Sequence, residues 1–219
     1  MTKSAPTPRR RYSPEVRRSM ILDEVADLIE ENGVSAITMD QVAQSCGVSK
    51  SLVYNYFDSL TDLLKELLER ELKTLRERQY EAAKAAETFE DLVRSVTHEY
   101  LAYIDERGLI IERLQSEPSI SDTDDPTQYG RSASVDYLAP VVANNFDLPM
   151  DLARAATDIS YGLPAAAGQY LLTREMTLQE VEDIAVSMII GSVVMVKNDY
   201  LIKRKKLRRK RNDQTRNDR

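Results

Sequence analysis

The sequence predicts an all-α fold in which a small N-terminal helical unit precedes a larger C-terminal helical domain. Apolar residues recur every three or four positions through most of the chain, as they do along one face of a helix. Only seven glycines and eight prolines occur among 219 residues, against many Leu, Ala, Glu, Lys and Arg. Serine or threonine precedes several of the periodic segments, where its side chain can cap a helix.

The composition argues against several classes of site. A single cysteine, Cys46, cannot form an intramolecular disulfide or a cysteine zinc cage, and a single histidine, His98, cannot supply a two-histidine metal site. No nucleophile elbow, phosphate loop or metal constellation is visible, so we expect no enzyme, no metal and no cofactor. Cys46 is expected to be a small core residue, and His98 an exposed residue rather than a ligand.

The chain also lacks patterns typical of export or of a membrane span. Its first fifteen residues contain no apolar run of the kind that a signal peptide has. The longest apolar stretch, Met188 to Val196, is too short to cross a bilayer. We therefore expect a soluble, cytoplasmic protein with no membrane partner.

Charge is strongly segregated along the chain. The net charge of −6 divides into +5 for residues 1–22, +8 for residues 197–219 and −19 for the residues between them. Two basic ends around an acidic body suggest an anionic partner that one surface meets. The alternative is that the charged ends are merely solvated.

The N-terminal third is predicted to contain four helices. Residues 1–12 are rich in Pro, Ser and Arg and are expected to form a disordered basic arm. Caps and stop signals then predict helices at 14–32, 39–46 and 50–56, and a long helix from about residue 60. The capping residues are Ser13, Thr38, Ser49 and Ser59, and the glycine stops are Gly33 and Gly47.

The remainder of the chain is also predicted to be helical. Helices are expected at 89–106, 109–116, 127–146 and 150–173, the last with a bend near Pro164. The Ser-, Asp- and Pro-rich stretch 116–126 is expected to be a loop. A final helix starts at Thr177 and Glu180 and is expected to fray into the basic residues 203–211.

Residues 39–57 meet the spacing that a helix-turn-helix requires. Ala43 provides a small residue where the second helix crosses the first, and Gly47, four residues later, permits a positive φ in the turn. Val53, six residues further on, is an apolar residue that can point back into the crossing. Because these requirements are independent, meeting all of them is a specific signal.

Here the chain resembles the TetR family of transcriptional repressors. The resemblance covers roughly residues 10–70, namely RRSMILDEVADLIEENGVSAITMDQVA, CGVSKSLVYNYF and DSLTDLL. It implies a basic arm (1–12), a helix-turn-helix DNA-binding domain (13–59), a helical ligand-binding and dimerisation domain (60–202) and a basic tail (203–219). In one departure, Leu60 stands where the family often has a lysine that reaches a DNA phosphate.

The predicted DNA-binding residues lie on the second helix of this motif and in the arm. Asn55 can bond adenine, Leu52 can touch a thymine methyl group, and Lys50 suits guanine or phosphate. Hydroxyl groups suit phosphate oxygens, which set the register of the protein on DNA. The full set is Arg9, Arg10, Arg11, Thr38, Ser49, Lys50, Ser51, Leu52, Tyr54 and Asn55. Tyr54 is assigned to DNA from the resemblance, whereas Tyr56 and Phe57 are expected in the core.

The resemblance further implies a homodimer that binds a palindromic operator and a small molecule that releases it. Pairing would use the last two helices, which carry small residues at 165–168 and at Gly191 and Ser192. Tyr100, Tyr103 and Tyr170 suit a lipophilic or aromatic inducer, although they are equally well read as core residues. A nonspecific or architectural DNA-binding protein is the alternative function. The tail is read as a solvated end or as a phosphate-binding segment, and its place after the last helix favours the first reading.

Overall fold

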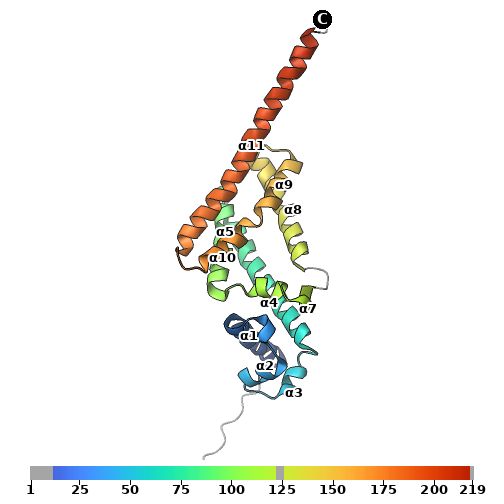
Figure 1. The fold of residues 1–219 in the computed structure, drawn as a ribbon, viewed down its shortest axis with the longest axis vertical. Coiled ribbons are helices and arrows are strands. Elements are labelled where there is room, and N and C mark those ends of the chain that lie inside the picture. The colour runs from blue at the N-terminus through green and yellow to red at the C-terminus, as the bar shows by residue number, and fades with distance from the viewer. Residues whose placement is uncertain (1–11, 122–125, 218–219) are drawn as a thin grey trace, which may run out of the picture. The chain divides into compact units, whose positions relative to one another are not determined.

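The computed structural model describes residues 12–121 and 126–217, with side chains described for 12–120 and 131–207. Every regular element in this part of the chain is a helix, which confirms the predicted all-α fold (Figure 1). The helices group into two compact units. Unit 1 comprises residues 12–72 and 109–121, and unit 2 comprises residues 73–108 and 126–217. The long helix α4 (Leu60–Ala85) contributes its first half to unit 1 and its second half to unit 2.

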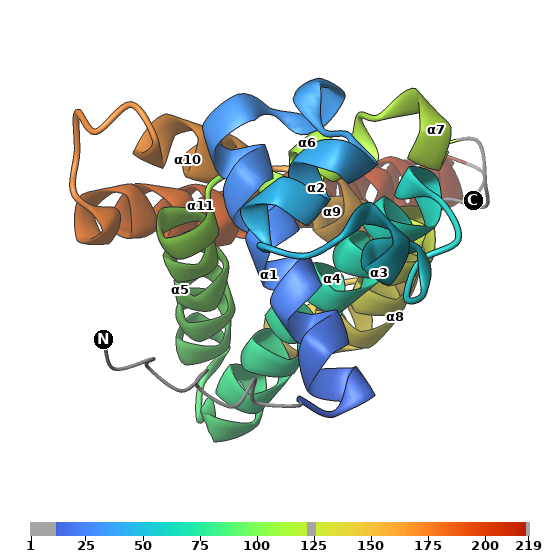
Figure 2. The ribbon, with the colours of Figure 1, turned by 90° about the horizontal axis from the view of Figure 1, so that it is seen from below.

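Unit 1 contains the helices predicted for the N-terminal third, together with two short helices from later in the chain (Figure 2). Where a helix was predicted, its bounds agree to within two residues at each end, whereas the 3-10 helix and the last short helix of this unit were not predicted. The helices of unit 1 are α1 (Pro14–Asn32), the 3-10 helix η1 (Val34–Ala36), α2 (Met39–Ser45), α3 (Lys50–Tyr54), the start of α4, α6 (Ile110–Gln115) and α7 (Pro118–Ser121).

The predicted caps define where these helices begin. The hydroxyl groups of Ser13, Thr38 and Ser49 accept hydrogen bonds from backbone N–H groups three residues ahead, at 3.2–3.3 Å. Ser59 accepts one from the Asp62 N–H at 3.0 Å. Each cap satisfies an N–H group that the helix itself leaves unpaired, which contributes about 1 kcal/mol.

The core of unit 1 forms where apolar faces of α1 and α4 meet the shorter helices. Buried residues on α1 are Ile21, Leu22, Val25, Ala26 and Ile29, and those on α4 are Leu63, Leu64, Leu67 and Leu68. Arg18 on α1 forms a two-pronged ion pair with Glu66 on α4. The same guanidinium lies 4.7 Å from the centre of the Phe57 ring. One side chain therefore ties α1 and α4 to the residues that follow α3.

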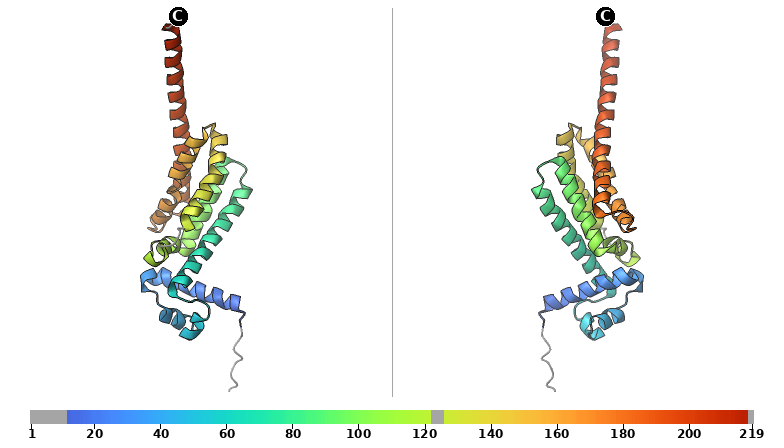
Figure 3. Two further views of the ribbon diagram at one scale, coloured as in Figure 1. Left: turned by 90° about the vertical axis from the view of Figure 1, so that its right-hand side faces the viewer. Right: turned by 90° about the vertical axis from the view of Figure 1, so that its left-hand side faces the viewer.

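Unit 2 is built around α5 (Phe89–Arg107), which packs against α10 and α11 (Figure 3). Thr88 and Asp91 form a reciprocal capping box at its start. The other helices of this unit are α8 (Pro126–Phe146), α9 (Met150–Ser160), α10 (Leu163–Leu171) and α11 (Leu178–Asn217). Two apolar clusters hold them, one around Leu101, Leu171 and Val181 and one around Val142, Ala153 and Val193.

Two predictions about unit 2 and the loop before it were wrong. The segment 150–173 is two helices rather than one bent helix, because Pro164 has no N–H for the Ser160 carbonyl and its ring would clash there. The segment 116–126 is not wholly a loop, because Pro118 begins the short helix α7 with its fixed φ.

The prediction that the last helix frays at residue 203 was also wrong. Helix α11 continues to Asn217 over 40 residues, and Figures 1 and 3 show its C-terminal part running on past α8 and α9. The sequence contains no Gly or Pro after Gly191, and Lys and Arg are good helix formers. Nothing local therefore ends the helix.

Helix α11 also bears on the expectation that the chain has no segment able to span a membrane. Its segment Leu178–Leu207 is long and apolar enough, by length and composition alone, to cross a membrane, unlike the shorter run considered above. Only 17% of the apolar window is buried, but α11 packs against α5, α9 and α10 within unit 2. The packing favours a helix of a folded domain.

Candidate DNA-binding site

The turn between α2 and α3 is a Schellman motif centred on Gly47. The Val48 N–H donates to the Ala43 carbonyl at 3.0 Å, and the Gly47 N–H donates to the Gln44 carbonyl at 3.1 Å. Gly47 has φ +63°, which an L side chain rarely adopts. A Cβ at this position would meet no atom within 4 Å, so the glycine is required by the backbone and not by space.

Helix α3 is held by the residues that the sequence predicted for the crossing. Val53 has no exposed surface, and Val42 and Ala43 on α2 are also buried. Phe57, just after α3, is buried as predicted, whereas Tyr56 is half-buried. With Val53 fixed inward, Lys50, Ser51 and Tyr54 of α3 are exposed to solvent.

The structure brings most of the predicted DNA-binding residues to the solvent-exposed face of this motif. Thr38 caps α2, Ser49 caps α3, and Lys50 and Ser51 follow in the first turn of α3; all are exposed. The Ser49 and Ser51 hydroxyl oxygens lie 3.1 Å apart. Tyr54 is 44% exposed at the end of α3. This cluster is hydroxyl-rich, which suits phosphate oxygens.

Three predicted residues are placed differently from the rest. Leu52 is half-buried rather than fully outward, and Asn55 is exposed but lies at the C-cap, one residue beyond the end of α3. Leu60, which stands where the family often has a lysine, is half-buried at the start of α4. Arg9, Arg10 and Arg11 lie outside the described residues.

The structure adds one residue that the sequence analysis missed. The Lys50 ammonium donates to the Asp40 carboxylate at 2.9 Å, which links the first turns of α2 and α3. This hydrogen bond, together with the negative charge of Asp40, raises the pKa of Lys50. Asp40 could have been noticed as an acid in the first turn of a helix, where the helix dipole favours it, but the sequence does not show its pairing.

Cys46 closes α2 and is half-buried. Burial raises the pKa of its thiol, and the nearby Glu24 carboxylate raises it further. A thiol that stays protonated is a poor nucleophile and a poor metal ligand. Among the described residues, no three His, Cys, Asp or Glu side chains are grouped so that they could hold a metal ion.

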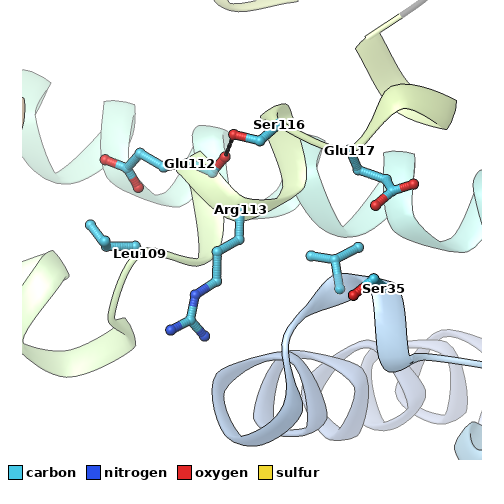
Figure 4. A pocket seen from close by; sticks show the side chains of 7 residues that line it. Ser35, Leu109, Glu112, Arg113, Ser116 and Glu117 are labelled. Carbon is cyan, nitrogen blue, oxygen red and sulfur yellow. Dashed lines mark hydrogen bonds between the residues drawn. The ribbon is translucent and has the colours of Figure 1, made fainter.

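Helix α6 is fastened to the C-terminal end of α1 by Arg113. Its guanidinium donates to the Ile29 carbonyl at 2.9 Å and to the Glu30 carbonyl at 3.1 Å. These carbonyls belong to the last turn of α1, where a positive charge is favourable. Figure 4 shows Arg113 beside a hollow of about 400 Å³ between η1 and α6, with Ser35 on the opposite side. The Arg113 guanidinium is already used to join α6 to α1.

A second hollow, of about 340 Å³, lies within unit 2 beside α5 and α11. Here Glu182 is buried, and its carboxylate accepts a hydrogen bond from Arg94 at 3.0 Å. The other carboxylate oxygen lies 2.7 Å from Nδ1 of His98, whose side chain is half exposed. His98 is thus on the surface, as expected, but it is engaged with Glu182.

The three tyrosines predicted to bind a ligand line neither of these hollows. Tyr103 is 1% exposed in the core of unit 2. Tyr100 is half-buried against α10, where a Cβ on Gly168 would lie 3.2 Å from its ring. Tyr170 is exposed and its hydroxyl donates to Glu175 at 3.1 Å. Tyr100 and Tyr103 share α5, while Tyr170 lies on α10.

The helix-turn-helix segment matches known regulators. The sequence model described as "Bacterial regulatory proteins, tetR family" matches residues 21–67, which run from α1 into α4. The HTH-type transcriptional regulator BetI of Rhizobium meliloti (strain 1021) is 37% identical over 73 residues. Residues 21–67 are therefore a tetR-family segment. The match to BetI spans 33% of this chain and 36% of BetI, so the likeness to BetI covers about a third of each protein.

Solved structures extend the likeness from this segment to most of the fold. A TetR-like transcriptional regulator from Rhodococcus sp. RHA1 has a TM-score of 0.69 at 16% identity, covering 84% of this chain and 99% of that one. The ketosteroid transcriptional regulator KstR2 of Mycobacterium tuberculosis has a TM-score of 0.58 at 20% identity, covering 83% and 95%. These likenesses support the predicted two-part helical architecture. The named relatives are regulators of transcription, in keeping with the prediction that the chain is not an enzyme.

We expect Asp40→Asn to strengthen binding to duplex DNA of any sequence several-fold. The substitution frees the Lys50 ammonium for a phosphate and removes a negative charge beside it, so the slope of log K against log salt should steepen by up to about 0.9. Fluorescence anisotropy over a salt series measures both the affinity for DNA and the salt slope. Glu31→Gln, which removes the same charge from the end of α1, is the control. Weaker binding by Asp40→Asn would mean that the carboxylate positions Lys50 and does not compete for it.

Proposed function

We propose that this chain is a sequence-specific DNA-binding regulator of transcription that works in the cytoplasm as a homodimer, with a small molecule releasing it from DNA. The observation that carries the DNA-binding part is the outward cluster on α2 and α3, held by the buried Val53. A helix anchored on one side and lined with hydroxyl and amide groups on the other fits the major groove. The match to the tetR family supports the same reading.

The site separates groups that fix position from groups that read bases. Thr38, Ser49 and Tyr54 bring hydroxyls suited to phosphate oxygens, which carry no sequence information. Asn55 brings the amide that can bond both N6 and N7 of adenine. Lys50 reaches either guanine or phosphate once it leaves Asp40. The arm residues Arg9, Arg10 and Arg11 are proposed to add phosphate contacts.

Asn55→Ala is expected to relax specificity at one base position, with a loss of ~1–3 kcal/mol on the preferred site and little loss elsewhere. Tyr54→Phe, which removes only a hydroxyl, should weaken preferred and scrambled duplexes by similar factors. The preferred site is first selected from a random pool with the purified protein. If Asn55→Ala lost equal affinity for both duplexes, Asn55 would not be a base-reading residue.

Dimerisation is proposed to use the exposed apolar stripe of α11. Ile184, Met188 and Met195 are 48%, 53% and 65% exposed, and their spacing places them on one face of the helix with Gly191. A Cβ on Gly191 would meet nothing within 4 Å, so this face is open to a close neighbour. On α9, which packs against α11, Ile159 is also exposed, and its neighbour Ser160 lies 3.2 Å from Ser192 of α11.

Contiguous apolar surface of this kind marks an association site, and a second copy offers a matching face. Two-fold pairing would have to set two α3 helices about 34–36 Å apart to engage successive half-sites of a palindromic operator.

The double substitution Met188→Glu, Met195→Glu is expected to raise the dimer dissociation constant at least about 100-fold, because two methionines can no longer be buried. Sedimentation velocity over a concentration series measures it, and circular dichroism should show unchanged helix content. Ser132→Asp with Asn144→Asp adds the same charge to exposed positions of α8 and should leave the dimer intact. A dimer that survives the methionine substitutions would place the interface elsewhere.

The regulatory ligand is proposed to be largely apolar and to bind beside Tyr100, where α5 meets α10. Buried Tyr103 and neighbouring aliphatic residues provide apolar walls, and tyrosine hydroxyls provide polar contacts. Release requires the ligand to bind more tightly to the form that cannot engage both half-sites, since equal affinity for both forms shifts nothing. Such a protein acts as a repressor.

A thermal-shift screen of lipophilic metabolites tests this site. Removing one hydroxyl contact costs ~1 kcal/mol, so Tyr100→Phe is expected to weaken a true ligand about five-fold while leaving the fold intact. Tyr137→Phe, on the exposed surface of α8, is the matched control. A ligand that binds all three proteins equally would place the site away from Tyr100.

A nonspecific or architectural DNA-binding role remains the rival function. It requires basic ends but no outward amide or second domain, and it predicts equal affinity for any duplex. The same selection experiment separates the two, because an architectural protein would enrich no sequence.

A further inference from the structure

The C-terminal part of α11 is a helix that leaves the packed body of unit 2. The last residues of α11 that pack against the apolar cluster are Val196 and Tyr200. From Ile202 to residue 207, every side chain is exposed. The helix then continues to Asn217, so it extends about 24 Å past its last packed turns at 1.5 Å per residue.

This extension carries an unusual density of positive charge. Residues 203–211 read KRKKLRRKR, and residues 203–219 together have a net charge of +8 in a chain whose total is −6. Lys203 forms an ion pair with Asp199, one turn earlier. The sequence offers few other acids nearby, since Asp213 and Asp218 are the only ones after Asp199.

The basic side chains of this helix repel one another. Positions 204 and 208, 205 and 209, and 206 and 210 are basic pairs one turn apart, and like charges at that spacing destabilise a helix. A polyanion alongside the helix converts this repulsion into attraction and releases counterions as well. The helical state and a polyanionic partner therefore favour each other.

The arrangement of the charges favours nucleic acid over a membrane surface as the partner. A helix that lies on a bilayer needs one apolar face. The apolar residues here, Ile202 and Leu207, are five residues apart and so about 140° apart around the helix. Lys203, Arg204, Lys205 and Lys206 occupy consecutive positions and therefore surround it. Positive charge on all sides suits a groove lined by phosphates, as in helices that enter duplex DNA.

We propose that residues 203–217 form a second DNA-binding element, which contacts phosphates of duplex DNA without reading its sequence. A helix about 24 Å long matches roughly seven base pairs at 3.4 Å each. The element belongs to unit 2, whereas α3 belongs to unit 1. It does not depend on the proposed operator recognition, and it would supply affinity for any duplex beside the specific site.

The test compares full-length proteins in which four charges are removed from one place or another. One variant carries Lys203, Arg204, Lys205 and Lys206 changed to Gln, which preserves helix propensity. The control carries Lys73, Arg76, Lys84 and Arg154 changed to Gln, all of them exposed in unit 2. Anisotropy of a random-sequence duplex of about 20 base pairs over a salt series gives the slope of log K against log salt.

The 203–206 variant is expected to flatten this slope by roughly 2–3.5, at ~0.9 per lost phosphate contact, and the control by less than 1. The flattening should persist when Tyr54→Phe is added, because the two elements act separately. A chain that enriches no operator but keeps this slope difference would refute the proposed function and support the present inference. Specific operator binding together with identical slopes for the 203–206 variant and the control would support the proposed function and refute the present inference.

Vesicles of phosphatidylserine and phosphatidylcholine provide the competing partner. The proposal is overturned if the unsubstituted protein sediments with these vesicles, the 203–206 variant does not, and the two proteins have the same DNA salt slope. In that case the extension binds a membrane surface. Protection of the backbone amides of residues 203–207 from hydrogen exchange on adding duplex DNA, and not on adding vesicles, would support it.

Discussion

The orientation of α3 depends on a single apolar anchor, and the candidate DNA-binding surface depends on that orientation. A helix of five residues is too short to be stable by itself, so tertiary contacts must hold it. Val53, its fourth residue, has no exposed surface, and Phe57 follows under the Arg18 guanidinium. Because Gly47 allows the chain to turn sharply, the anchor leaves the hydroxyl side chains of α3 and the amide of its C-cap, Asn55, exposed to solvent.

In unit 2, buried contacts likewise orient a much longer helix, α11. Glu182 of α11 is buried, and a buried carboxylate is tolerated only when it is paired and hydrogen-bonded. Arg94 and His98 of α5 provide those partners, while Val181 enters the apolar cluster beside them. These contacts fix the rotation of α11. The face that remains outward carries Ile184, Met188 and Met195, which is why an apolar stripe is left exposed.

Helix α11 therefore combines three environments along one axis. Its first turns are packed and partly charged, its middle presents the apolar stripe, and its end carries the basic extension. Since nothing in the sequence interrupts the helix after Gly191, the extension is a rigid continuation of the segment proposed to dimerise. A dimer made through the stripe would display two basic helices, and their combined charge would favour a long polyanion such as duplex DNA.

The sequence by itself determined the helices of unit 1 and the turn within its motif, because caps, glycine stops and apolar spacing act over a few residues. The hydroxyls of Ser13, Thr38, Ser49 and Ser59 cap the helices that they predicted. Only the tertiary structure decided the pairing of Lys50 with Asp40, the half-burial of Leu52 and the attachment of α6 to α1 through Arg113. These involve residues far apart in the chain or a degree of burial that spacing does not encode. The break before Pro164 and the continuation of α11 to Asn217 were local features that the sequence analysis weighed wrongly.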